Sequence, residues 1–197
     1  MNFPLRWLAI LLLGYSAWAY WSSRPVLHPP GVLVAMDPVQ APLAAMPSLY
    51  RRGYQITPLQ SFSLEARVLG TERYRFGRGA ELAPIDLALG WGPMSDQSVL
   101  DRIDISQGGR FYFWHVSQFP IPRRDIETHS ANMHMIPATP DIERRLDSVR
   151  PGQIVMLRGY LVNVQGQDGF AWRSSLTRED TGAGACELVW VERFEAR

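Results

Sequence analysis

The chain contains no lysine, so every one of its 20 basic residues is an arginine. Without lysine, the protein has no side-chain amine for Schiff-base chemistry and none for a P-loop phosphate site. It also has a single cysteine, Cys186, whereas an internal disulfide bond requires two. The sequence therefore excludes lysine-dependent catalysis and a small secreted fold held together by disulfide bonds.

A large excess of charge of either sign is also absent. The 20 basic and 19 acidic residues give a net charge of +1, so there is no broad attraction for nucleic acid and we expect no such partner. Hydrophobic residues make up 46% of the 197 positions, which is ordinary for a globular protein and excludes a disordered one. The length allows one domain with a proper core.

The N-terminal segment Phe3–Trp21 is apolar, and its only charged side chain is Arg6. In a helix, about 19 residues span roughly 28 Å, close to the hydrocarbon thickness of a bilayer. Aromatic rings lie at both ends, as expected at headgroup level. We therefore predict a transmembrane helix over residues 1–21 that stays attached as a signal anchor. The alternative is a signal peptide cleaved at the small-x-small pattern Ala17–Ala19, which the surrounding aromatic residues make less favourable.

Either interpretation carries the rest of the chain out of the cytoplasm. An arginine-only composition is typical of a GC-rich genome, and in a Gram-negative bacterium the soluble domain would face the periplasm from the inner membrane, on a single pass. Residues 22–49 contain six prolines and are predicted to form an extended linker. The soluble β-rich domain is then expected over residues 50–197.

This domain is predicted to be mainly β. Residues Ser61–Phe76 alternate between apolar and polar, which is typical of a half-buried strand, and Arg110–Phe119 is aromatic and β-prone. The last third contains three predicted strands joined by polar or glycine-rich loops, and we expect them to pair in chain order as an antiparallel meander. These strands are Gln153–Val164, Phe170–Leu176 and Cys186–Phe194.

Two short helices are expected near Ser95–Ile103 and Pro140–Val149, because capping residues precede both segments. The expected class is α+β and mainly β, a small antiparallel sheet curled toward an OB-like barrel. The phrase PGQIVMLRGYLVNV followed by QGQDG is similar to the opening hairpin of oligonucleotide/oligosaccharide-binding (OB) barrels. That likeness concerns the fold and implies no function by itself.

Two of the four histidines, His129 and His134, lie five residues apart in the phrase HSANMH. This odd separation places them on opposite faces of a strand, and on a helix it sets them roughly 140° apart. We therefore expect no shared metal ion, and the sequence offers no motif for another metal or a cofactor. Asn132 and His134 share one face of the predicted strand and are candidate binding residues, whereas Met133 and Met135 occupy the buried face.

Cys186 is the candidate nucleophile of the chain. Its thiol would need His134 or His129 as a base, and Arg193 or Arg178 could stabilise an oxyanion. The domain organisation, with a membrane anchor, a β-rich domain and a cysteine near the C-terminus, is similar to that of sortase transpeptidases. The local sequence departs from theirs, because GAGAC precedes the cysteine and Arg193 follows seven residues later. The simpler interpretation is a small buried residue at the start of the last strand, where free cysteines are common.

The glycine-rich segment Asp180–Ala185 could offer backbone N–H groups to an anion, which makes Asp180 a further candidate binding residue. It precedes a predicted strand and not a helix, so it lacks the context of a dinucleotide or P-loop site. A solvated turn is the simpler interpretation of its acidic residues.

Four phrases, DLALGWGPMSD, HSANMHMIPA, VRPGQIV and SSLTREDTGAGACELVWVE, resemble those of a family of proteobacterial membrane-anchored proteins with no established activity. The resemblance covers most of the soluble part and supports an inner-membrane setting. We therefore expect a membrane-anchored periplasmic module of unknown ligand, which binds an envelope protein or a glycan or supports a membrane complex. The alternative is a sortase-like acyl-transfer enzyme that uses Cys186 and a histidine.

Overall fold

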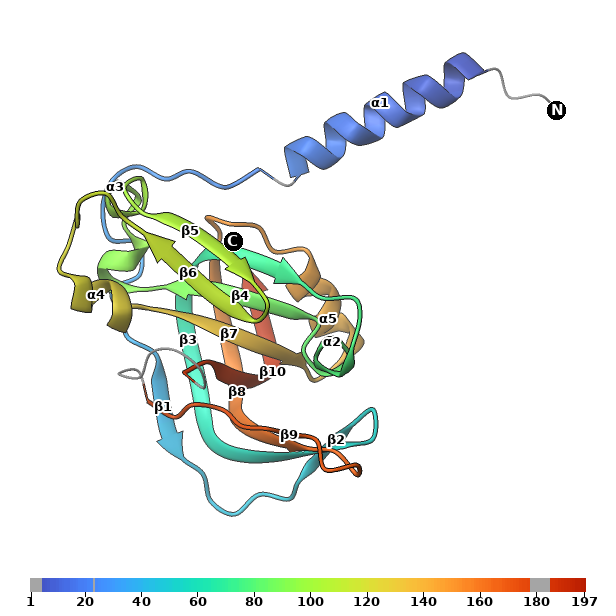
Figure 1. Ribbon diagram of the computed structural model, residues 1–197, viewed down its shortest axis with the longest axis vertical. Coiled ribbons are helices and arrows are strands. Elements are labelled where there is room, and N and C mark those ends of the chain that lie inside the picture. Colours follow the sequence, from blue (N-terminus) through green and yellow to red (C-terminus); the bar gives the residue numbers. More distant parts are fainter. Residues whose placement is uncertain (1–4, 23, 178–184) are drawn as a thin grey trace.

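The computed structural model describes residues 5–22, 24–177 and 185–197. The first element is helix α1 (Leu5–Ser22), which projects away from the strands in Figure 1. Within the described ranges, no helix combines the length and the apolar character that crossing a membrane requires. The transmembrane anchor therefore stays a prediction.

The remainder of the described chain is mainly β, as predicted, with a curled sheet and a few short helices (Figure 1). The strands are β1 (Val39–Pro42), β2 (Leu49–Arg51), β3 (Tyr54–Arg73), β4 (Ile85–Gly90), β5 (Asp104–Gly108), β6 (Phe111–His115), β7 (Ser130–Pro137), β8 (Ile154–Gln165), β9 (Ala171–Trp172) and β10 (Glu187–Ala196). The short helices are α2 (Arg78–Leu82), the 3-10 turn η1 (Gly92–Ser95), α3 (Gln97–Leu100), α4 (Arg123–Thr128) and α5 (Pro140–Asp147).

Five of these strands form a closed ring. β3 pairs with β4, β4 with β7, β7 with β10, β10 with β8, and β8 returns to β3. Every pair in the ring is antiparallel except β7 with β10, which is parallel. β3 closes the ring because its 20 residues are enough to pair with β8 through Gln55–Arg67 and with β4 through Arg67–Arg73.

The order predicted for the last three strands is wrong. The segment expected as a full strand is reduced to β9, which pairs with the last two residues of β8. β10 does not follow β9 in the sheet and instead lies between β7 and β8. The physical reason is burial, because the first five residues of β10 are buried and such a strand requires a neighbour on each side.

The interior of the ring is an apolar core. Strand β7 contributes Met133 and Met135 to it, as its alternation predicted, and α5 adds Ile142 and Leu146. Thr139 caps α5 by accepting a hydrogen bond from the backbone N–H of Ile142, so this predicted helix is present. The helix expected near Ser95 is split into η1 and α3, and α2 and α4 were not expected.

The proline-rich segment after Arg24 is extended, and its middle part packs on the barrel. The ring nitrogen Nε2 of His28 lies 2.8 Å from the Gly152 carbonyl oxygen, and Val34 is buried in the core. Further along, β1 pairs with the middle of β3. We call residues 26–42 the strap.

Ser95 holds the strap in place. Its Oγ is completely buried, accepts hydrogen bonds from the backbone N–H groups of Leu33 and Val34 at 3.1 and 3.0 Å, and donates one to the Gly92 carbonyl. Replacing Ser95 with alanine leaves the buried N–H of Val34 and the partly buried N–H of Leu33 without their acceptor, so we expect the free energy of unfolding in urea to fall by about 2 kcal/mol. Limited proteolysis should then cleave within the strap first.

The control for this prediction is Ser98→Ala, because the Ser98 hydroxyl is exposed and binds the nearby Asp96 carboxylate. This variant should differ from the unchanged protein by less than about 0.5 kcal/mol. Equal loss of stability in both variants would show that Ser95 does not hold the strap.

Candidate functional site

The β5–β6 hairpin lies across the outer face of β4 and β7 (Figure 1). Its two-residue turn consists of Gly109 and Arg110, with φ angles of +60° and +73°. Two positive φ values are typical of the type I′ turn, whose twist matches that of antiparallel strands. The turn therefore holds Arg110, a non-glycine residue, in a left-handed conformation over the barrel.

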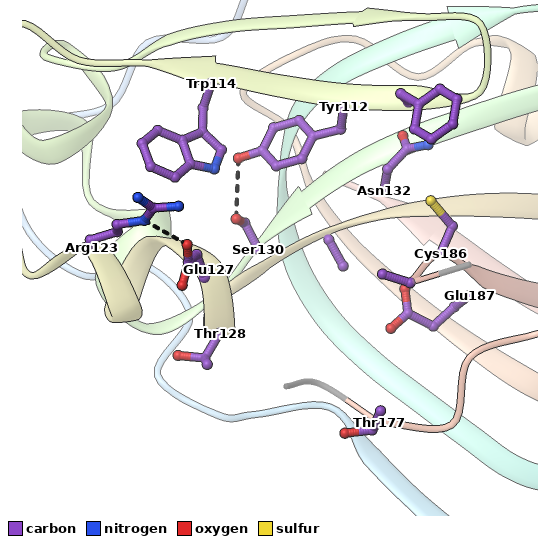
Figure 2. A pocket seen from close by; sticks show the side chains of 13 residues that line it. Tyr112, Trp114, Arg123, Glu127, Thr128, Ser130, Asn132, Thr177, Cys186 and Glu187 are labelled. Atoms are coloured by element: carbon purple, nitrogen blue, oxygen red, sulfur yellow. Dashed lines mark hydrogen bonds and ion pairs between the residues drawn. The ribbon is translucent and has the colours of Figure 1, made fainter. Parts of the chain in front are cut away.

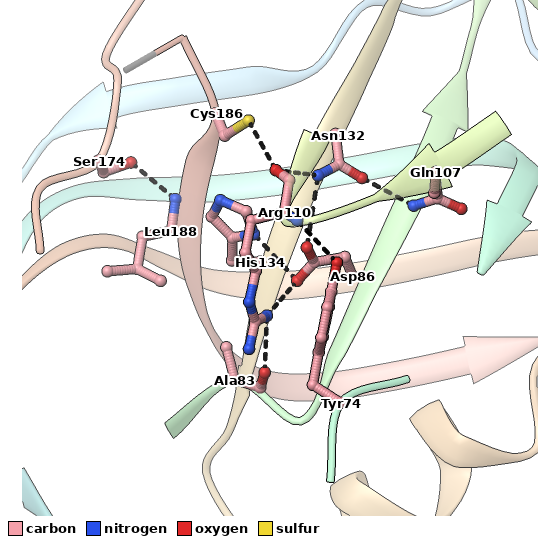
Figure 3. Close-up of polar contacts among 10 residues, drawn as sticks. All are labelled: Tyr74, Ala83, Asp86, Gln107, Arg110, Asn132, His134, Ser174, Cys186 and Leu188. Carbon is pink, nitrogen blue, oxygen red and sulfur yellow. Dashed lines mark hydrogen bonds and ion pairs between the residues drawn. The ribbon is translucent and has the colours of Figure 1, made fainter. Parts of the chain in front are cut away.

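A polar network joins this turn to the barrel through Asp86 of β4 (Figure 3). The Asp86 carboxylate is completely buried, and its Oδ1 lies 2.6 Å from Nη1 of Arg110 and 2.9 Å from Nδ1 of His134. The distance between Asp86 and His134 is that of an ion pair, but the two groups are not aligned as a hydrogen bond. Asn132 donates to the second carboxylate oxygen at 3.5 Å and accepts a hydrogen bond from Gln107 of β5.

Arg110 is the centre of this network. Its guanidinium lies over the ring of Tyr74 at 3.6 Å and near the ring of Trp172 at 5.3 Å, and it donates to the Ala83 carbonyl. Its backbone N–H donates to the Tyr74 hydroxyl. Burial, followed by the Asp86 charge, raises the pKa of Tyr74 to about 12, so the phenol is neutral at physiological pH.

The candidate residues of the sequence are only partly brought together. His134 and Asn132 share one face of β7, as predicted, and both contact Asp86. The His134 ring also packs on Trp172, with ring centroids 4.8 Å apart. Cys186 directs its thiol to the Arg110 carbonyl at an Sγ···O distance of 3.8 Å.

One other candidate among the described residues does not join this group. Arg193 is exposed on β10, seven residues beyond Cys186 and therefore roughly 20 Å further along the strand. Asp180, like Arg178, lies outside the described residues.

The two histidines of HSANMH lie in separate surroundings. Nδ1 of His129 lies 2.9 Å from the Asp125 carbonyl oxygen at the end of α4, and its ring contacts Gly92. His134 is held instead by Asp86, on β4. Within residues 5–22, 24–177 and 185–197, no group of three or more metal-binding side chains is assembled.

Next to the network is a pocket of about 260 Å³ between β6, α4, the start of β7 and the start of β10 (Figure 2). Its volume lies just below the usual range for small-molecule sites, which suits one side chain or one sugar ring. The lining residues are Phe111, Tyr112, Trp114, Arg123, Glu127, Thr128, Ser130, Ala131, Asn132, Thr177, Ala185, Cys186 and Glu187.

The pocket combines aromatic rings with buried polar groups. The Tyr112 hydroxyl lies 3.1 Å from Oγ of Ser130, which itself donates to the Ile126 carbonyl. Burial raises the pKa of Tyr112 to about 12, so this hydroxyl also stays neutral at physiological pH. The Glu187 side chain belongs to a residue that is 1% exposed, and it lies beside Cys186 in Figure 2.

Arg123 and Glu127 form the charged rim of the pocket. Nε of Arg123 lies 2.8 Å from Oε1 of Glu127 one helical turn away, and its guanidinium lies 5.9 Å from the centre of the Trp114 ring. The two opposite charges of this pair therefore neutralise each other at the rim.

Sequence reasoning missed most of these residues. The phrase RFYFWH predicts a strand with alternating faces, and Tyr112 and Trp114 do share one face, but nothing in the phrase says that this face meets β7. Asp86 and Arg110 are 24 residues apart, so only the folded barrel shows their pairing. Glu187 follows Cys186 directly, and its adjacency to the candidate cysteine was the one available signal.

The chain matches no protein-family model, no curated protein and no solved structure. The role of the pocket is therefore inferred from its geometry and chemistry.

Proposed function

We propose that this chain is an OB-like binding module of the bacterial envelope, tethered to the inner membrane by its N-terminal segment and exposed to the periplasm. The strand order supports the barrel class, because five ring strands with one long first strand and α5 between the third and fourth follow a Greek-key arrangement. In OB barrels the second and third strands and the flanking loops bind the ligand. The equivalent strands here are β4 and β7.

The observation that carries this proposal is the pocket beside that face. The β5–β6 hairpin, inserted between β4 and β7, covers part of the face and leaves the pocket at its margin. Aromatic side chains surrounding a few buried polar groups are the usual composition of a binding site, since the rings supply contact area and the polar groups fix orientation. Trp114, Tyr112 and Glu187 are the side chains that we expect to contact the ligand.

The acyl-transfer alternative has less support. Cys186 lines the pocket, which is the feature that favours it. A cysteine nucleophile also needs a base within hydrogen-bond reach, and the His134 ring is engaged with Asp86 and Trp172. None of the described lining residues is a histidine. Binding therefore explains the pocket better than catalysis does.

Site-specific photo-crosslinking in cells tests this function. A photoreactive phenylalanine analogue replaces Phe111, which is 44% exposed at the pocket rim, and in a control chain it replaces Met156, which is 43% exposed on β8. We expect a crosslinked adduct from position 111 that Trp114→Ala reduces at least about fivefold, because the ring supplies contact area. Position 156 should give none.

Digestion identifies the adduct. Loss of the adduct on protease treatment shows a protein partner, and loss on treatment with a muramidase shows a glycan. Absence of an adduct from position 111, or equal adducts from both positions, would refute a binding role for the pocket.

A further inference from the structure

Three polar side chains of the pocket, Tyr112, Ser130 and Asn132, have already committed their hydrogen-bond donors. Ser130 gives its only hydroxyl proton to a backbone carbonyl of α4 at 2.6 Å. The Tyr112 hydroxyl must therefore be the donor in its 3.1 Å contact with Oγ of Ser130. The side-chain amide of Asn132 donates to the Arg110 carbonyl and to the Asp86 carboxylate. What each of the three side chains still offers is an oxygen lone pair, which accepts a hydrogen bond.

The remaining donors of the pocket belong to two other side chains. Arg123 uses Nε to bind Glu127, so its two terminal nitrogens carry N–H groups that have no acceptor among the described residues. The indole N–H of Trp114 also has no acceptor within the described part of the chain. In Figure 2 this nitrogen is directed toward the side of the pocket where Tyr112 lies. The pocket therefore presents acceptors and donors to the same ligand.

A hydroxyl group fits this combination, because a single oxygen donates one hydrogen bond and accepts others. An ammonium group would have no acceptor for the N–H groups of Arg123 and Trp114. A carboxylate or phosphate would have no proton to donate to Tyr112 or Ser130. A polar group that enters a pocket without the matching partner loses its bonds to water and gains none, so the pattern discriminates among ligands.

The apolar part of the pocket selects the scaffold that carries the hydroxyl. Strand β6 supplies the rings of Phe111, Tyr112 and Trp114 to the lining. A sugar ring has apolar C–H faces that pack on aromatic rings, and hydroxyl groups around its edge that reach the polar side chains. The cavity of about 260 Å³ admits one such ring. A serine or threonine side chain also carries a hydroxyl but would leave most of this volume empty.

We propose that the ligand of the pocket is one sugar ring of a glycan chain, recognised through its hydroxyl groups. The proposal rests on the proposed binding function and specifies the class of its ligand. Trp114 supplies the apolar contact for one face of the ring. Tyr112 and Ser130 accept hydrogen bonds from the sugar hydroxyls, and Arg123 donates to them at the rim.

Titration calorimetry tests this proposal on the full chain in micelles of a detergent without a sugar headgroup. One probe is the trisaccharide of N-acetylglucosamine, a sugar of bacterial cell-wall glycan, and another is maltotriose, which has hydroxyls and no acetamido group. The third and fourth probes are the same trisaccharides with their hydroxyls methylated. We expect at least one unmodified sugar to bind with a Kd of about 1 mM or tighter, and its methylated form to bind at least about tenfold more weakly.

The two unmodified sugars distinguish cell-wall glycan from a glucose polymer as the source of the ring. Binding of neither trisaccharide would overturn the sugar ligand. Equal binding of an unmodified sugar and its methylated form would overturn recognition through hydroxyl groups.

The Tyr112→Phe variant removes the acceptor oxygen and keeps the ring, so sugar binding should weaken about fivefold. The matched control is Tyr50→Phe, because Tyr50 is 72% exposed on β2 and lies outside the pocket lining. This control should bind the sugar as the unchanged protein does. Equal binding by both variants would contradict the role of the Tyr112 oxygen.

A second variant, Arg123→Met, removes the donors at the rim and keeps an unbranched side chain. The Arg123 side chain is 70% exposed, so this variant should fold and should bind the sugar about fivefold more weakly. Its control is Arg158→Met, at an exposed arginine of β8 outside the pocket lining, which should leave binding unchanged. Unchanged binding by the Arg123 variant would contradict its role as a donor.

The crosslinking result separates this proposal from the function on which it rests. An adduct at position 111 that a muramidase removes supports both. An adduct that only a protease removes, with no sugar bound in the titrations, would overturn the sugar ligand and retain the binding function. Absence of both the adduct and sugar binding would remove both.

Discussion

Replacing Asp86 with alanine should lower the free energy of unfolding by about 3–5 kcal/mol. The carboxylate is fully buried and faces Arg110, His134 and Asn132, so its removal leaves the partly buried guanidinium of Arg110 without its charged partner. Removing one partner of a buried ion pair costs far more than the pair contributes as a unit. Urea denaturation of the full chain in detergent measures the change.

The Arg110→Ala variant should lose a similar amount, and the double variant should lose much less than the sum of the two. Such coupling is expected for residues in direct contact and shows that one interaction is being removed twice. The control is Asp141→Ala on α5, which removes a carboxylate paired with Arg145 at the surface, and it should leave the unfolding midpoint unchanged. Additive losses at Asp86 and Arg110 would contradict a shared network.

This network also connects stability to the β5–β6 hairpin, which lies beside the pocket. Gln107 and Arg110 both belong to the hairpin, and their contacts with Asn132 and Asp86 hold it on the barrel. In the Asp86→Ala variant we expect faster amide hydrogen exchange in β5 and β6 than in the ring strands, since local opening follows lost buried contacts. Undocking would also open the pocket and weaken ligand binding.

Local patterns predicted the parts of the site that lie within one element. The register of β7 follows from its alternation, because Met133 and Met135 enter the core and this places Asn132 and His134 together on the other face. The capped helix α5 could also be predicted from the sequence, because Thr139 and Pro140 mark its start.

Contacts between distant elements could not be predicted from local patterns in this way. The closure of the ring depends on β8 returning to β3, and the position of β10 depends on which edges remain open after that closure. The predicted meander failed at this point, because pairing neighbours in chain order ignores the burial of both faces of β10. The sequence did not identify Asp86 as a site residue either. The role of an acidic residue in an apolar strand can be predicted only when its partner is known.

Replacing Gly159 with alanine should destabilise the barrel by about 3 kcal/mol. Gly159 lies in β8, where it is paired with Phe62 of β3 and with Val191 of β10 at the same time. An added Cβ would lie 1.8 Å from the Trp190 carbonyl oxygen, and this neighbour is backbone that cannot rotate away. A glycine inside a strand often marks such a close approach or a corner of a barrel. The ring can accept the methyl group only by separating β8 from β10.

The matched control is Gly108→Ala, at the end of β5. No atom lies within 4 Å of the Cβ position there, so this variant should stay within roughly 0.5 kcal/mol of the unchanged protein. Near-ultraviolet circular dichroism and urea denaturation compare the two variants, since both replace a strand glycine with alanine and differ in what the methyl group meets. Equal stabilities would show that the β8–β10 contact at Gly159 yields easily, and that the ring is not held closed at this position.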